Sequence, residues 1–274
     1  MNAIPEIRPG QSIELLKELH ILTRDGKLNQ DSRRKLKQVY HLYQFIEPLL
    51  KEVSKDESHH LTLVDHGAGK SYLGFILYDL FFKNSKSGEV FGIETRQELV
   101  TKSQNLAQAL KFQNMKFLNL SVEESIHSNQ IPNTVDIVTA LHACDTATDD
   151  AISFALKKTA RYVVLVPCCQ AEVASILRKT KGKNLGKNLL TEIYRHPIHT
   201  REFGSHLTNV LRCLKLEAHG YQVTVTELIG WEHSMKNELI IAEFKDLPRA
   251  YPRQKLEGLL NELNLDDLKV RFLE

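Results

Sequence analysis

Hydrophobic and polar residues form two kinds of pattern along this chain, one typical of strands and one typical of helices. The order of these patterns predicts the order of the secondary-structure elements. Short apolar runs bounded by glycine or charged residues predict strands over 61–64, 89–94, 115–120, 135–141 and 162–166. Longer segments in which apolar residues recur every three or four positions lie between these runs and predict helices. Strands that alternate with helices in this way indicate a parallel α/β sheet.

The alternation of strands and helices stops near the end of the chain. Two β-rich runs, 221–228 and 238–244, are separated by only about ten residues, which is too few for a helical crossover. These runs predict an antiparallel hairpin. The expected fold is therefore α/β, a Rossmann-like seven-stranded sheet that is parallel except for this terminal hairpin.

Segments on either side of the predicted sheet have a helical pattern. The stretches 12–21 and 31–53 carry apolar residues at helical spacing, with many Lys and Arg between them. We expect three parts, which are an N-terminal helical extension over 1–57, a main domain over 58–246 and a C-terminal helical tail over 247–274.

Composition narrows the class of protein. A chain of 274 residues, 42% hydrophobic and 26% charged, can bury one sizeable core. Its net charge of +2 excludes a protein that coats nucleic acid through overall charge, so any such contact needs a local basic patch. Four cysteines form no disulfide framework, and no stretch approaches the roughly 18 apolar residues of a membrane span. We therefore expect a soluble protein of a reducing, cytoplasmic compartment.

A glycine-rich turn follows the first predicted strand. A strand that turns sharply into a helix needs residues without Cβ where its backbone approaches a ligand closely, and Gly67 and Gly69 meet that need. The turn predicts a shelf of nucleoside size. The residues expected to line it are Asp65, His66, Gly67, Ala68 and Gly69.

Further cofactor contacts are expected at the ends of later strands. Glu94 ends the second strand, where a carboxylate can accept hydrogen bonds from both hydroxyls of a ribose that carries no 2′-phosphate. After the third strand, Ser121 and Val122 are placed to meet an adenine ring with a polar and an apolar side chain. Leu141 and His142, at the end of the fourth strand, complete the predicted set.

Two rival phosphate-binding motifs fail at one position each. The run Gly69-Lys70-Ser71 imitates the end of a P-loop, but the first glycine of that motif would fall at Val64. The dinucleotide fingerprint G-x-G-x-x-G would need its third glycine at Tyr72.

Three segments together resemble the class I S-adenosylmethionine-dependent methyltransferases. They are 64–73 around the glycine turn, Ala-Leu-His-Ala-Cys-Asp over 140–145 and Val-Pro-Cys-Cys-Gln over 166–170. Within that class the chain is similar to METTL25-like methyltransferase-domain proteins and, more distantly, to Trm13-type tRNA 2′-O-methyltransferases. The resemblance covers roughly 61–244. It implies S-adenosylmethionine as cofactor and methyl transfer as the reaction.

The chain departs from these families in two respects. The class pattern has a third glycine after Gly69, and Ser71 stands there instead. The Cys/His module attached to the tRNA enzymes is not visible in this sequence, which puts a tRNA substrate in doubt.

Polar residues after the fourth and fifth strands are the candidates for chemistry, because ligands bind beyond the carboxyl ends of parallel strands. Transfer from an electrophilic methyl group requires a positioned acceptor and a group that removes its proton. The candidate bases are His142, Asp145 and, in the hairpin turn, His233. Two structural alternatives stay open, since Asp145 fits an N-cap of the helix that begins near Thr146, and His142 can simply pack.

The acceptor pocket is expected to use neighbours of these residues. Trp231 in the hairpin turn can stack on a base or can simply pack. The predicted pocket residues are Cys144, Pro167, Cys168, Cys169 and Trp231. His142 and the three cysteines also form a conceivable zinc set, but C-x-x-C spacing is missing, so we expect no metal.

A basic segment follows the fifth strand and suggests a partner. It is expected to form a flexible arm that touches RNA phosphates, although an ordinary solvated loop fits the same pattern. Its cations are Arg178, Lys179, Lys181, Lys183 and Lys187, and Arg195, His196, His199 and Arg201 follow.

Three functions are compatible with these features. The first is a methyltransferase that acts on RNA, with the ribose 2′-oxygen of tRNA as one candidate acceptor. The second is a methyltransferase for small molecules or proteins. The third is a noncatalytic module that keeps a nucleoside pocket, because a fold does not by itself establish function.

Overall fold

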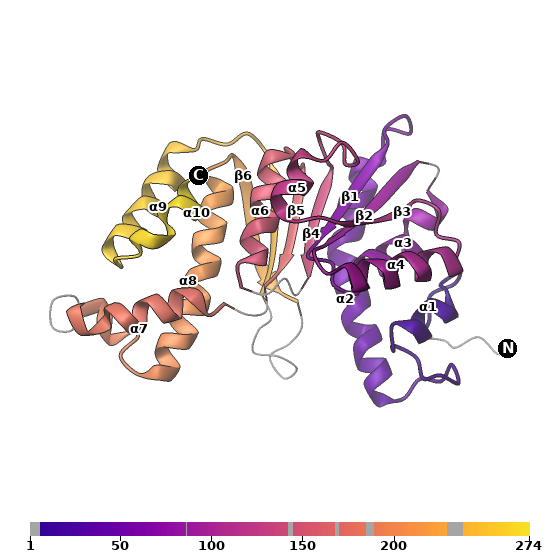
Figure 1. The fold of residues 1–274 in the computed structure, drawn as a ribbon, viewed down its shortest axis with the longest axis horizontal. Coiled ribbons are helices and arrows are strands. Elements are labelled where there is room, and N and C mark those ends of the chain that lie inside the picture. Colours follow the sequence, from indigo (N-terminus) through magenta and orange to yellow (C-terminus); the bar gives the residue numbers. More distant parts are fainter. Residues whose placement is uncertain (1–5, 86, 142–144, 168–169, 185–188, 229–237) are drawn as a thin grey trace.

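The computed structural model describes residues 6–85, 87–141, 145–167, 170–184, 189–228 and 238–274. Its centre is a single seven-stranded sheet (Figure 1) in the order β3-β2-β1-β4-β5-β7-β6. The strands are β1 Leu61–His66, β2 Gly88–Glu94, β3 Met115–Asn119, β4 Ile137–Leu141, β5 Tyr162–Val166, β6 Tyr221–Glu227 and β7 Glu238–Phe244. The strands β1 to β5 are parallel, and β7 runs antiparallel to both β5 and β6. The expected fold class is confirmed.

Helices cover both faces of this sheet. The α-helices are α1 Ile13–Glu18, α2 Gln30–Val53, α3 Tyr72–Leu80, α4 Gln97–Ala109, α5 Val122–His127, α6 Ala147–Lys157, α7 Glu172–Asn184, α8 Pro197–Glu217, α9 Ala250–Glu262 and α10 Lys269–Leu273. Short 3-10 turns lie at η1 Phe82–Asn84, η2 Leu189–Glu192 and η3 Asp266–Leu268.

The N-terminal helix α2 belongs to the main core. Its Ile46 and Leu50 are fully buried in one apolar cluster with Leu63 of β1 and Phe75 of α3. The predicted N-terminal segment therefore covers one face of the sheet, because the apolar side of α2 packs toward the same face of β1 and β2.

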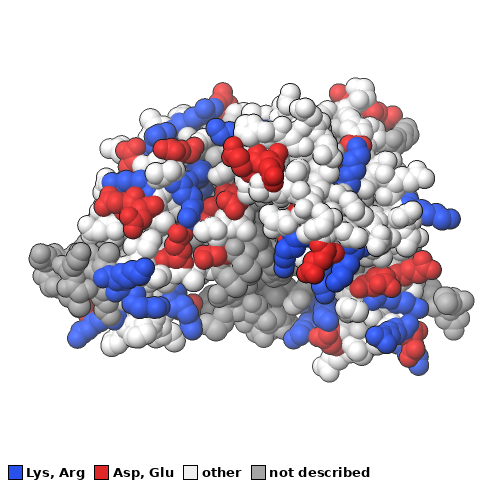
Figure 2. Space-filling model, viewed as in Figure 1, with Lys and Arg blue, Asp and Glu red and all other residues white. Residues whose placement is uncertain are grey.

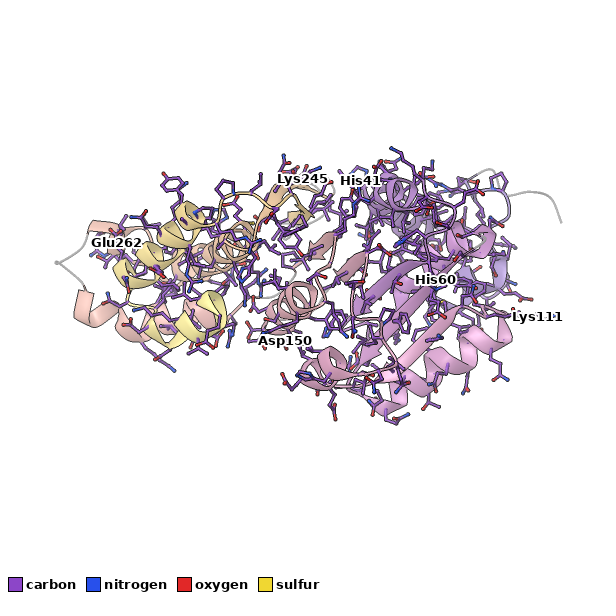
Figure 3. All side chains as sticks on the ribbon, turned by 90° about the horizontal axis from the view of Figure 1, so that it is seen from above. His41, His60, Lys111, Asp150, Lys245 and Glu262 are labelled. Carbon is purple, nitrogen blue, oxygen red and sulfur yellow. The ribbon has the colours of Figure 1, made fainter. Side chains whose placement is uncertain are left out.

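The opposite face carries α5, α6 and part of α8. Val64 of β1 and Phe91 of β2 pack there against Ile152 and Phe154 of α6. The C-terminal segment forms a separate cluster, in which Leu260 of α9 and other apolar residues pack with Leu211 of α8. Seen from above (Figure 3), Lys111 and Glu262 lie toward opposite ends of the molecule, with Asp150 of α6 between them.

The segment expected to be a flexible basic arm is largely helical. Arg178 and Lys179 lie on α7, and α8 begins at Pro197. The two helices pack closely, since a Cβ on Gly204 would lie 2.6 Å from the backbone nitrogen of Ala174. This close packing against α8 holds α7 in a fixed position. The run of basic residues gave no indication of it in the sequence. No helix in the described ranges is long and apolar enough to cross a membrane.

Candidate cofactor and acceptor site

The glycine turn after β1 requires left-handed backbone. Gly67 has φ +64° and Gly69 has φ +58°, a region that glycine enters without the steric penalty of a Cβ. The Ala68 N–H donates a hydrogen bond of 2.9 Å to the carbonyl of Ile93, which fastens the turn to β2. The predicted sharp turn from β1 into the following helix is present, and its glycines are left-handed.

Ser71, which replaces the third glycine of the class pattern, also has a left-handed φ of +51°. Its hydroxyl is buried and has no hydrogen-bond partner among the described residues. A Cβ on Gly74 would lie only 2.6 Å from this oxygen. Gly74 therefore makes room for the serine, a compensation that we did not infer from the sequence.

Asp65 lies beneath the turn, with only 2% of the residue exposed. Its carboxylate accepts a hydrogen bond of 2.8 Å from the Thr139 hydroxyl on β4 and another from the Gly74 N–H. Burial raises the pKa of Asp65 to about 6, although both hydrogen bonds oppose that shift. In this structure Asp65 ties the turn to β4 and to the start of α3, and its direct contact with a cofactor stays a prediction.

Glu94 carries the strongest geometric support for nucleoside binding. Its carboxylate accepts the Gly69 N–H at 2.8 Å and the Arg96 N–H at 3.0 Å. Burial opposes ionisation, but the Arg96 guanidinium and these N–H donors together lower the pKa of Glu94 to about 2. Glu94 is therefore ionised at neutral pH and is a strong acceptor for ribose hydroxyls beside the glycine turn.

Arg96 competes for the same carboxylate. Its Nε and Nη2 lie 3.0 and 3.1 Å from the two Glu94 oxygens, and Nη2 would lie 3.8 Å from a Cβ on Gly69. The guanidinium therefore lies beside the turn, and its side chain is 62% exposed. A ribose that binds Glu94 must share or displace it.

We expect Arg96→Ala to strengthen binding of the nucleoside cofactor by about two- to fivefold, the worth of an exposed ion pair. Isothermal titration of the purified protein checks this change in Kd. The matched control is Lys116→Ala, which breaks the exposed Lys116–Glu89 pair without touching Glu94. Weaker binding by Arg96→Ala would instead make Arg96 a cofactor ligand.

His66 is only 4% exposed, and neither ring nitrogen has a described hydrogen-bond partner. Its ring lies 5.4 Å from that of Phe154, centroid to centroid, on the α6 side of the sheet. Burial lowers the pKa of His66 to about 4, against the pull of Glu94, so the imidazole is neutral at pH 7. Contact of this side chain with a cofactor stays a prediction.

The predicted adenine contact at Ser121 has a local structural role. Ser121 is the N-cap of α5. Its hydroxyl accepts a hydrogen bond of 3.3 Å from the Glu124 N–H, and its own N–H donates at 2.7 Å to the Glu124 carboxylate. This arrangement is a reciprocal capping box. Ser121 and Val122 are both half-buried, and their contact with adenine is not tested.

The connections after β4 and β5 meet as the sequence predicts. The Asp145 carboxylate accepts a hydrogen bond of 3.3 Å from the Ala171 N–H, just before α7. The alternative in which Asp145 caps α6 is wrong, because Thr146 is the N-cap residue. The Asp145 carboxylate bonds instead to the Ala171 N–H. Leu141 is half-buried at the end of β4, and Pro167 is buried after β5.

Several predicted site residues lie outside the described residues, and their roles stay predictions. They are His142, Cys144, Cys168, Cys169, Trp231 and His233. The conceivable zinc set falls wholly on four of these positions.

Sequence reasoning missed a polar stripe on α8. Ser205, Asn209 and Arg212 recur at spacings of four and three, so they lie on one side of the helix. Arg212 and Asn209 are buried. The available signal was a charged residue in register with two other polar residues, among apolar positions such as Leu211 and Leu214.

Comparison with known proteins now identifies the family. Residues 34–176, just over half of the chain, match the family model described as a methyltransferase domain. The chain belongs to this family. Within a methyltransferase domain, we predict that the turn at Gly67 and Gly69 and the carboxylate of Glu94 form the cofactor side of the site.

Individual relatives of this methyltransferase domain are distant. A Bos taurus protein named glutathione S-transferase C-terminal domain-containing protein is 24% identical over 240 residues, covering 80% of this chain and 34% of its own. The chain thus spans about a third of the length of that curated relative.

Two solved structures are also similar. An rRNA methylase from Streptococcus thermophilus is 11% identical with a TM-score of 0.43, covering 74% of this chain and 95% of its own. The N-terminal domain of human METTL16, in complex with SAH, is 10% identical with a TM-score of 0.45, covering 77% and 71%. The family assignment rests on the sequence match.

The cofactor of this methyltransferase domain is S-adenosylmethionine, which supplies an electrophilic methyl group on a sulfonium. The residues present fit it. Glu94 is ionised and can hold the ribose hydroxyls, and the left-handed glycines at 67 and 69 keep side chains away from the nucleoside.

Proposed function

We propose that this protein transfers the methyl group of S-adenosylmethionine to RNA, with a ribose 2′-hydroxyl as the acceptor. The observation that carries the RNA proposal is a pair of exposed cations on α7, Arg178 and Lys179. Neither makes an ion pair with another described residue.

These cations lie on the helix that begins at the edge where we propose that transfer occurs. Helix α7 begins at Glu172, directly after Ala171, which is hydrogen-bonded to Asp145 at the end of the β4 connection. Arg178 is six residues into the helix, so it lies about 9 Å along the axis at 1.5 Å per residue. A strand of RNA placed with one ribose at Asp145 would have phosphates within reach of both cations.

Other cations nearby are already neutralised. Arg195 pairs with Glu192 at 3.3 Å and Arg201 with Glu202 at 2.7 Å. Lys and Arg side chains gather at the lower left of the molecule (Figure 2), where α7 and the start of α8 lie (Figure 1). Unpaired cations gain most from a phosphate, because they do not lose an existing partner.

The choice of a hydroxyl acceptor rests on the end of β4. Enzymes that methylate exocyclic amines typically have Asn or Asp followed by Pro-Pro-aromatic at this position, and Leu-His-Ala-Cys stands here over 141–144. A ribose hydroxyl needs a positioned base because its ordinary pKa is far above neutral. Asp145 is half-buried at this edge and is the described residue that we propose for that role.

The direct test is transfer of labelled methyl from S-adenosylmethionine to separate RNA, protein and metabolite fractions. We expect label in RNA, in nucleosides whose 3′ linkage resists alkali because the 2′-oxygen is methylated. Label in protein or metabolites alone would overturn the RNA proposal in favour of another acceptor. Cofactor binding without any transfer would favour a noncatalytic module.

Reversing the charge of both α7 cations tests whether Arg178 and Lys179 bind RNA. We expect Arg178→Glu with Lys179→Glu to weaken RNA binding about tenfold or more at low salt and to flatten its salt dependence, since phosphate contacts release counterions. Fluorescence anisotropy with labelled RNA measures both effects.

The control for this pair is Lys37→Glu with Lys111→Glu, which makes the same change in net charge at two exposed positions. Lys111 lies toward the end of the molecule away from α9 (Figure 3). Equal loss of RNA binding in both double variants would show that overall charge, rather than α7, attracts RNA.

A further inference from the structure

Three connections end at residues that bond to helix α8. Asp145, Gln170 and Glu238 are the first described residues after 142–144, 168–169 and 229–237. The Arg212 Nη2 donates to the Asp145 carbonyl at 2.7 Å, and the Gln170 Nε2 donates to the Asn209 Oδ1 at 3.1 Å. The Asn209 amide also donates to the Glu238 carboxylate.

Arg212 is the centre of this buried network. The residue is 1% exposed, and its guanidinium donates to both oxygens of Asp149 on α6, at 2.6 and 3.1 Å. A third nitrogen, Nη1, donates to the Asn209 Oδ1 at 3.2 Å. One planar guanidinium thus joins α6, α8 and the connection after β4, which an ammonium on Lys could not do with the same geometry.

A contribution to folding stability does not by itself explain why Arg212 and Asp149 are buried together. A buried ion pair is often no more stabilising than apolar residues of similar volume, because desolvation offsets the attraction between the charges. Here the polar groups also meet at the carboxyl-terminal edge of the sheet. Ser205 completes the set by donating to the Gln170 Oε1 at 2.7 Å.

The backbone at Asp145 has a conformation that needs support. Its φ is +51°, in the left-handed region that residues other than glycine enter at a cost. Arg212 binds its carbonyl, and the Ala171 N–H binds its carboxylate. These two bonds fix both the position of Asp145 and its distance from the connection after β5.

We infer that Arg212, together with Asn209, is a positioning residue for methyl transfer, which sets Asp145, Gln170 and the start of β7 at Glu238 relative to one another. It touches neither cofactor nor acceptor and acts through Asp145, Gln170 and Glu238. The inference rests on the proposed function for its activity readout.

The test separates positioning from stability with two replacements. Arg212→Lys keeps the positive charge but loses the planar guanidinium that donates to several acceptors at once. Arg212→Met combined with Asp149→Leu removes the pair as a unit, so that neither charge of the pair is buried without the other. The control is Arg271→Met. Arg271 pairs with Glu172 and lies 3.9 Å from Asp149, so it borders the same network, but it donates to none of the three edge residues.

For each folded variant, S-adenosylmethionine Kd, melting temperature, and the kcat and KM of methyl transfer to RNA are measured. We expect both Arg212 variants to keep Kd within about twofold and to lose kcat by up to about 100-fold, as misplacement by an ångström does. Arg271→Met should retain kcat. A double variant with wild-type kcat would overturn the inference.

A second readout does not depend on the acceptor. Hydrogen exchange at the Ala171 amide should become at least about tenfold faster in the double variant and should stay unchanged in Arg271→Met. If the wild type binds cofactor but does not methylate RNA, the proposed function fails and this exchange rate still decides the inference. Unchanged Ala171 exchange in the double variant would overturn it.

Discussion

Glu94→Ala should lower the affinity for S-adenosylmethionine by about 1000-fold. A hydrogen bond to a charged group is worth about 2 kcal/mol net, and the carboxylate can accept one from each ribose hydroxyl, so about 4 kcal/mol is lost. The pKa of Glu94, about 2, means that the acceptor is ionised throughout the physiological range. Isothermal titration of both proteins at pH 7 measures the loss.

The same carboxylate also accepts the Gly69 N–H, so its removal could disturb the turn. Glu94→Gln answers this point, because its amide oxygen can still accept that bond. We expect intermediate affinity from this variant. The control is Glu98→Ala, an exposed carboxylate on α4. An affinity of Glu94→Ala within about threefold of wild type would contradict the assignment of Glu94 to the ribose.

His66→Leu should make the protein more stable, and increasingly so as the pH falls. At pH 7 the substitution removes two buried nitrogens that have no described partner, a gain of about 1 kcal/mol or more in the free energy of unfolding. At lower pH a second effect is added, since the pKa of His66 is held at about 4 by burial.

The direction of that second effect follows from proton binding. The unfolded chain protonates this histidine below about pH 6.5, whereas the folded protein does so only below about 4. Between these values the unfolded state binds more protons, so wild-type stability falls as the pH is lowered. The loss relative to His66→Leu reaches about 3 kcal/mol at pH 4, at 1.36 kcal/mol per pKa unit.

Urea titrations of wild type and variant at pH 7, 5.5 and 4 provide this comparison. The difference between the two proteins is the useful quantity, because Asp65 affects both equally. With its pKa raised to about 6, Asp65 makes both proteins more stable as the pH falls over much of the same range. His206→Leu, at an exposed position on α8, is the control. A wild-type-to-variant difference that stays constant across the three pH values would contradict a buried, neutral His66.

Local pattern was sufficient to predict a glycine turn after β1 and a carboxylate at the end of β2. Gly69 and Glu94 are 25 residues apart, yet the sequence assigns both to one site, and the Gly69 N–H bonds to the carboxylate at 2.8 Å. The reason is that a strand, a turn and a helix recur as one unit, and the carboxyl ends of adjacent parallel strands share an edge. The terminal hairpin followed in the same way from a connection too short to cross over.

The partners of buried polar groups were decided by tertiary structure alone. Periodicity indicates which side of α8 is buried, but it does not indicate that Arg212 meets Asp149 on α6, 63 positions away. Nor does it show that Arg96 folds back onto Glu94. Local sequence determines backbone rhythm because it acts through neighbours, whereas ion pairs and close contacts such as Gly204 on Ala174 depend on how separate elements pack.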